Sequence, residues 1–205
     1  MKINIHYSFL VLAVICLFTS KIIEMFIFLF IILLHELSHA LVGLAFHKKV
    51  KRITITMIGG VVEICGNYST FLKEFLINVS GIIMNCIILA LASFLKNDYY
   101  KNLIVDFNCL MIIINVLPIY PLDGYRLLDS LVYSYFHSFK AMKKVVLISI
   151  VSSFLFLLFG IFEKSGGIII IGIFLIFKNL GLKFHQETLF VRKEVSYYQN
   201  NLLTN

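Results

Sequence analysis

Residues 22–46 read IIEMFIFLFIILLHELSHALVGLAF, a hydrophobic stretch interrupted near its end by the pentapeptide HELSH at positions 35–39. About 20 apolar residues are enough for a helix to cross the hydrocarbon core of a membrane. On such a helix His35 and His39 lie one turn apart on the same face, so both imidazoles can bind one zinc ion. Glu36 can then reach a water on that ion. Because ionisable side chains inside an apolar span are costly, the stretch predicts a metal-dependent hydrolase site within a membrane.

The composition of the chain is that of a membrane protein. Hydrophobic residues make up 60% of its 205 residues and charged residues 14%, whereas a soluble domain is about half apolar and about a quarter charged. The apolar residues occur in blocks, several of which are long enough to span a bilayer. We therefore expect an all-α polytopic membrane protein with about six transmembrane helices. These helices are expected at about residues 7–19, 22–46, 75–95, 103–117, 145–162 and 167–177.

A small β-hairpin is expected next to the helix that carries HELSH, within residues 53–64. The run begins with isoleucine and threonine in alternation, which is typical of a strand, and is then broken by Gly59 and Gly60. The edge of such a hairpin is a place where an extended substrate can add as a further strand. The two glycines permit its close approach. The alternative is a loop that only shields the site.

The net charge of +7 comes from lysines and arginines that gather at the ends of the apolar segments. Cytoplasmic connections of membrane proteins are enriched in these residues. Their distribution therefore predicts that both termini are cytoplasmic and that HELSH lies nearer the cytoplasmic face. No basic stripe with interleaved aromatic residues is present, so the charge indicates a lipid bilayer as partner and no nucleic acid.

The third metal ligand must come from elsewhere in the chain, because a catalytic zinc ion usually has three protein ligands and one water. The best candidate is Asp123, in the segment NVLPIYPLDG at residues 115–124. Both prolines of the chain lie there and prevent a continuous helix. Two alternatives need no metal: Asp123 as the N-cap of a following helix, and His35 and His39 as partners in interhelical hydrogen bonds.

An HExxH motif inside a span, followed much later by the 115–124 segment, resembles the site-2 protease family (peptidase family M50) of intramembrane zinc metalloproteases. The resemblance covers residues 22–131, which correspond to the conserved core. Gly81-x-x-x-Asn85 also matches the family pattern Gly-Pro-x-x-Asn, with Ile82 in place of the proline. This difference leaves the ligands intact and concerns only the local bend of the third helix.

The resemblance implies a zinc metalloendopeptidase with one Zn2+ per chain, bound by His35, His39 and Asp123, and with Glu36 as general base. It further implies a multi-pass protein of the bacterial cell membrane that cleaves membrane-associated or transmembrane protein substrates, in regulated intramembrane proteolysis. Small members without a PDZ domain include proteases of a sporulation sigma-factor precursor. The resemblance also leads us to expect membrane regulatory partners.

Two asparagines are candidates for binding the substrate. The resemblance implies that Asn115 stabilises the oxyanion or holds the substrate strand, and that Asn85 does similar work. For Asn115 the alternative is a polar cap at a helix end.

We expect a protease domain at residues 1–181 and a polar C-terminal tail at residues 182–205. Two other functions compete with proteolysis. One is a catalytically inactive homologue that acts as a binding partner or scaffold, against which the complete set of candidate ligands and base argues. The other is a transporter or metal-handling protein, which would more often show two related halves with broken helices. We find no such internal symmetry.

Overall fold

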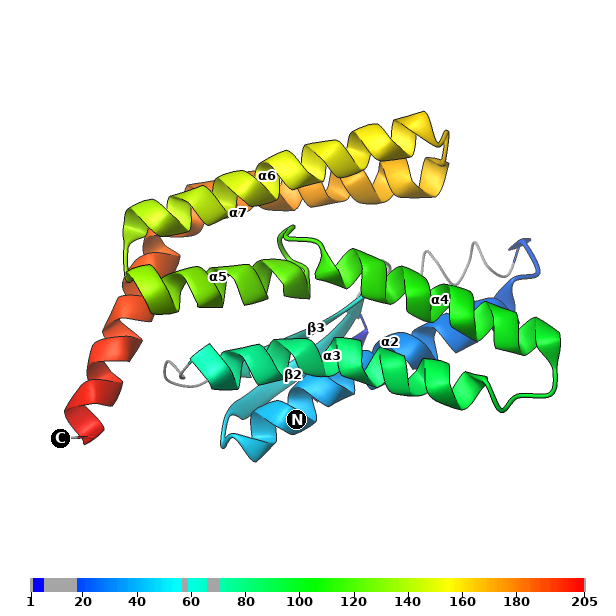
Figure 1. Cartoon of the computed structure of the whole chain (residues 1–205), viewed down its shortest axis with the longest axis horizontal. Coiled ribbons are helices and arrows are strands. Elements are labelled where there is room, and N and C mark those ends of the chain that lie inside the picture. The colour runs from blue at the N-terminus through cyan, green and yellow to red at the C-terminus, as the bar shows by residue number, and fades with distance from the viewer. Residues whose placement is uncertain (1, 6–17, 57–58, 66–70, 205) are drawn as a thin grey trace. The chain divides into compact units, whose positions relative to one another are not determined.

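The computed structural model describes residues 2–5, 18–56, 59–65 and 71–204 (Figure 1). The described residues form, in chain order, β1 (Lys2–Ile5), α2 (Ile22–Ala45), β2 (Lys49–Thr56), β3 (Gly59–Cys65), α3 (Phe71–Ala92), α4 (Asp98–Val116), α5 (Asp123–Phe136), α6 (Phe139–Phe162) and α7 (Gly166–Thr204). The chain divides into two compact units. The first consists of Met1–Gly66 with Val79–Ile113, and the second of Asn67–Asn78 with Ile114–Asn205.

Four described helices are long and apolar enough to cross a membrane: α2, α3, α6 and the Gly166–Val195 part of α7. Helix α4 lies where the fourth span is expected but is not among them. Its hydropathy is lowered by charged and amide side chains, including Lys101, Asp106 and Asn108. The first expected span, at about residues 7–19, falls almost wholly on residues 6–17, which lie outside the described residues.

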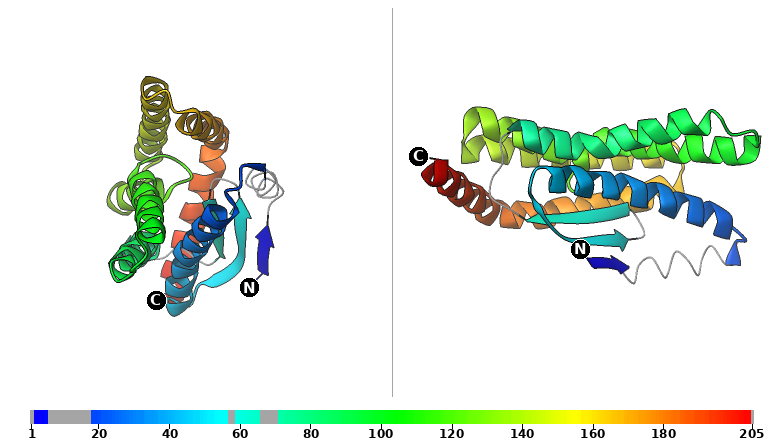
Figure 2. Two further views of the ribbon diagram at one scale, coloured as in Figure 1. Left: turned by 90° about the vertical axis from the view of Figure 1, so that its right-hand side faces the viewer. Right: turned by 90° about the horizontal axis from the view of Figure 1, so that it is seen from below.

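In the first unit a three-stranded sheet lies against α2, as the right-hand view of Figure 2 shows. Strands β2 and β3 pair antiparallel, with Ile53 opposite Val62 and Thr56 opposite Gly59. Residues 57–58, where the turn of the expected hairpin falls, lie outside the described part of the chain. Strand β1 pairs parallel to β2. The sequence does not predict β1, because a four-residue strand is too short to give a periodic pattern.

Helices α2 and α4 pack through apolar side chains in the first unit. Ile31 and Ile32 of α2 are buried against Met111 of α4, and the rings of Phe28 and Phe107 lie 5.1 Å apart. This cluster precedes HELSH by one turn of α2. It therefore fixes the rotation of the helix and directs His35, His39 and Glu36 to a buried position.

In the second unit α6 and α7 form a closely packed antiparallel pair. A Cβ atom at Gly160 would lie 2.7 Å from Cγ2 of Ile168, and one at Gly172 would lie 3.0 Å from Cα of Leu157. Small residues let membrane helices approach each other in this way. Helix α7 continues without a break to Thr204, so the expected boundary between residues 181 and 182 falls inside one helix.

Candidate metal centre

HELSH lies in the second half of α2, where its polar side chains are buried. His35 and His39 are 1% and 2% exposed, and Glu36 and Ser38 are also buried. Between Ile22 and Val42 the helix contains no glycine or proline, so the motif sits on regular helical backbone. The hydroxyl of Ser38 donates a 2.6 Å hydrogen bond to the carbonyl of His35, which satisfies this polar group within the helix.

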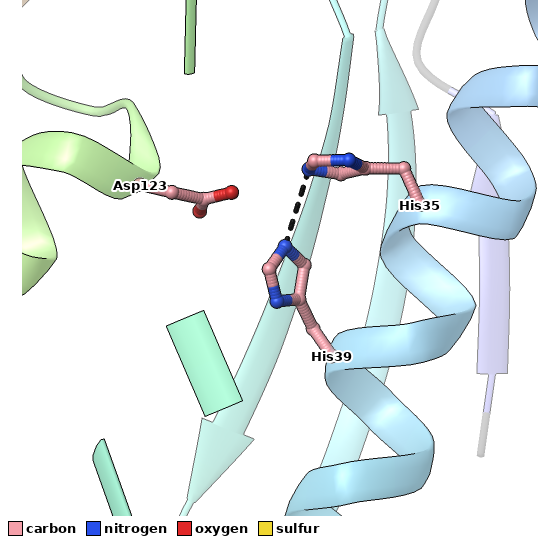
Figure 3. Close-up of side chains that lie close together, drawn as sticks. All are labelled: His35, His39 and Asp123. Atoms are coloured by element: carbon pink, nitrogen blue, oxygen red, sulfur yellow. Dashed lines mark hydrogen bonds between the residues drawn. The ribbon is translucent and has the colours of Figure 1, made fainter. Parts of the chain in front are cut away.

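The two imidazoles meet through their Nε2 atoms, which lie 3.2 Å apart, with the rings nearly perpendicular at 83° (Figure 3). Zinc binds histidine nitrogen at about 2.0–2.1 Å, and tetrahedral geometry then places two such nitrogens about 3.3 Å apart. The observed separation therefore fits two nitrogens that share one ion. The same distance suits an N–H···N hydrogen bond between the rings.

Ser80 of α3 holds the second ring of the pair. Its Oγ lies 3.2 Å from Nδ1 of His39, the ring nitrogen that does not face His35. Metal-binding histidines commonly donate their other ring N–H to an oxygen, which fixes the tautomer and the ring orientation. When Nδ1 of His39 donates to Ser80, Nε2 carries no proton and its lone pair can bind a metal. Sequence reasoning missed Ser80, and only its place beside the Gly81-x-x-x-Asn85 pattern could have pointed to it.

Gly81 lies directly against both rings. A Cβ atom at this position would be 2.5 Å from Cε1 of His35, 2.5 Å from Nε2 of His39 and 2.6 Å from Nε2 of His35. No side chain larger than hydrogen fits there without displacing a ring. The sequence singled out Gly81 as part of a motif, and the structure gives the motif a physical reason.

Asn85 lies one helical turn after Gly81 on α3, which places the two residues on the same face. It is fully buried, and neither the nitrogen nor the oxygen of its amide has a hydrogen-bond partner within the described residues. Buried amides are normally paired, so an exception calls for an explanation such as a ligand.

In the second unit, Asp123 is the first residue of α5 and is 5% exposed. The N-cap position belongs to Leu122, so Asp123 is not the N-cap residue that the alternative interpretation requires. Its Oδ1 lies 3.9 Å from Nη1 of Arg126. Burial raises the pKa of the neighbouring Tyr125 far above its ordinary value, so this phenol stays neutral. Figure 3 draws the Asp123 carboxylate at the start of α5.

The sequence PLDG at residues 121–124 ends in Gly124, a position where no larger residue fits. A Cβ atom here would lie 2.3 Å from the carbonyl oxygen of Val116 and 2.4 Å from that of Leu117. The start of α5 therefore lies directly against the end of α4. Asn115 is half-buried in the last turn of α4.

The two hairpin glycines begin β3. Gly59 pairs with Thr56 and Gly60 with Ile55 of β2. Because β3 is an outer strand of the described sheet, these residues lie on a strand with a free side in the order β1-β2-β3.

Comparison with known proteins gives three matches. Residues 7–136 match a family described as Peptidase M50B-like. The chain is 30% identical over 134 residues to stage IV sporulation protein FB of Bacillus subtilis (strain 168). The match covers 62% of this chain and 46% of that protein, so the chain spans about half the length of this relative. The site-2 protease from Methanocaldococcus jannaschii has the same fold, with a TM-score of 0.69 at 22% identity, covering 87% of this chain and 89% of that chain.

Proposed function

Because this chain belongs to the M50B-like peptidases, we propose that it is an intramembrane zinc metalloprotease that hydrolyses peptide bonds of membrane-associated or transmembrane proteins. One observation carries the proposal: two buried imidazoles, with Nε2 atoms 3.2 Å apart, inside a helix that is apolar enough to cross a membrane. Ionisable groups at such a depth are retained for function.

The proposed metal ligands are His35, His39 and Asp123, which bind one Zn2+ per chain. When bound, the ion supplies a Lewis acid that activates water and polarises the scissile carbonyl. The nitrogen and carboxylate donors of these residues are of the types that catalytic zinc prefers. Support for Asp123 comes from its place in the PLDG segment, its burial and its position within α5 instead of at the N-cap.

Glu36 is the proposed general base, which takes a proton from the attacking water and returns it to the leaving amine. Its carboxylate and the adjacent ligand His35 are buried on one regular helix. A base and a ligand on the same rigid element keep a constant relative position, which proton transfer requires.

Asn85 and Asn115 are proposed to bind the substrate. Support for Asn85 comes from its unpartnered buried amide and from its place one turn after Gly81, which touches both rings. A peptide carbonyl, or the oxyanion that forms from it, can accept a hydrogen bond from this amide. Gly59 and Gly60 then admit an extended substrate strand at the edge of the sheet.

We further propose that the protein crosses a bacterial cell membrane six times, that both termini are cytoplasmic, and that a β-hairpin lies beside the HELSH helix. The likeness to stage IV sporulation protein FB supports a sporulation sigma-factor precursor as substrate, with membrane regulatory partners.

The test is co-expression with candidate membrane-tethered substrates, comparing wild type with Glu36→Gln. We expect wild type to cleave a substrate and the variant to lose at least ~100-fold in rate, the usual contribution of general acid–base catalysis, while keeping its zinc. Glu24→Gln is the matched control, because Glu24 lies on the same helix and bonds to Lys21 and Tyr99. Persistent cleavage by Glu36→Gln removes Glu36 from the mechanism. Wild type without zinc or cleavage favours the alternative, an inactive homologue that acts as a scaffold.

A further inference from the structure

Two of the polar side chains that are fully buried in the helices after α5 bond to a segment outside their own helix. They are Ser149 of α6 and Asn179 of α7. A hydroxyl and an amide inside apolar helices are costly unless every polar atom is paired. Their partners therefore indicate why the chain retains them.

Both side chains bind the backbone of one residue, Tyr120. The backbone N–H of Tyr120 donates a 2.7 Å hydrogen bond to Oγ of Ser149, and the hydroxyl of Ser149 donates to Oδ1 of Asn179. The amide of Asn179 donates to the carbonyl of Tyr120 at 3.0 Å and to that of Leu175 at 2.9 Å. The bonds form a closed ring in which every donor hydrogen of the two side chains is used.

The backbone position of Tyr120 affects that of Asp123, because only two residues separate them in the sequence. The next residue, Pro121, has no backbone N–H and therefore cannot donate a hydrogen bond that would hold the chain at this position. The N–H of Leu122 folds back onto the carbonyl of Ile119 at 2.8 Å, and Ile119 is fully buried. The ring of bonds at Tyr120 therefore anchors a short, tight segment whose far end carries the Asp123 carboxylate.

We propose that Ser149 and Asn179 are positioning residues, which fix the segment before α5 so that Asp123 is held ready to bind the metal. This inference rests on the proposed function, in which Asp123 is the third ligand. It extends the functional machinery beyond residue 136, where the family match ends. A merely structural role, in which the two side chains only satisfy buried backbone groups, would leave metal binding unchanged once the protein is folded.

Ser149→Ala is compared with Ser153→Ala in the purified full chain. Ser153 is the matched control, since it lies one turn later on α6, is equally buried, and donates its hydroxyl only to Ile150 in its own helix. Zinc affinity is measured by competition with a chelator, and the absorption spectrum of Co2+-loaded protein reports the coordination geometry. We expect Ser149→Ala to weaken zinc binding ~10-fold or more, by analogy with loss of outer-shell partners, and to change the cobalt spectrum. Ser149→Thr, which keeps the hydroxyl, should restore both.

The outcomes separate this inference from the proposed function. Wild type that binds no Zn2+ overturns both. Wild type that binds Zn2+, with Ser149→Ala equal to Ser153→Ala in affinity and in cobalt spectrum, overturns the inference alone. If Ser149→Ala does not fold, Ser149→Cys replaces it, because a thiol fills the space that alanine leaves empty but hydrogen-bonds weakly. The cysteine variant should then show weaker zinc binding at unchanged Tm, and wild-type affinity in that variant overturns the inference.

Discussion

Replacing Gly81 by alanine adds one methyl group at the point where α3 touches both imidazoles. The new Cβ would lie 2.5 Å from His35 Cε1 and 2.5 Å from His39 Nε2. Ordinary contacts between such atoms are about 3.5–4.0 Å. The methyl group or the rings must therefore move by roughly 1 Å.

A displacement of that size is large for a metal centre. Metal–ligand distances are held within about 0.2 Å of their ideal values, so a shift of roughly 1 Å is about five times the tolerance. The helix itself gains from the change, since alanine favours a helix interior over glycine by roughly 0.5–1 kcal/mol. We therefore expect Gly81→Ala to lose zinc binding by ~100-fold or more and to lose proteolysis, while the protein remains folded.

The assay is the metal content and zinc affinity of the purified variant, with the Tm measured beside them. Gly181→Ala is the control, because Gly181 lies in α7 and an added Cβ there meets no atom within 4 Å. The control should keep its zinc. Wild-type zinc affinity in Gly81→Ala would refute the idea that this glycine makes room for two ligands of one ion.

Two further substitutions test the ligand set. Asp123→Ala should lower the zinc content to well below one ion per chain because a ligand is removed, whereas Asp129→Ala, on the same helix, should keep its zinc. Metal analysis of the purified variants checks both. Equal zinc content in the two variants points to another ligand. Ser80→Ala should weaken zinc binding ~10-fold because Nδ1 of His39 loses its partner. Ser93→Ala removes a hydroxyl that bonds only to its own backbone turn and should leave the zinc affinity unchanged. Zinc affinity is measured by competition with a chelator, and equal affinities in the two serine variants contradict the role of Ser80.

Apolar patterning predicts the helix that carries the site very well, because a long span leaves a strong signal in the sequence. The expected stretch at residues 22–46 corresponds to α2, Ile22–Ala45. The two prolines of the 115–124 segment likewise predict a break before Asp123, and α4 ends at Val116. These features depend only on local chemistry, so a single sequence is enough to find them.

Contacts between elements are not predicted in this way. The distance from Gly81 to the two rings depends on how closely α3 approaches α2, and no local pattern carries that information. The hydroxyl of Ser149 looks like any serine in a span until its bond to Tyr120 is known. The residues of the expected polar tail continue α7 to Thr204, because lysine, glutamate and glutamine favour a helix even where they mark the end of an apolar span.

The glycine contacts between α6 and α7 have a mechanical consequence. Backbones that approach so closely, and that also share the Ser149–Asn179 hydrogen bond, resist sliding past one another, so the two helices move as one rigid body. Because Ser149 and Asn179 both bond to Tyr120, a movement of this body pulls the backbone of Tyr120 with it and strains the short segment that leads to Asp123.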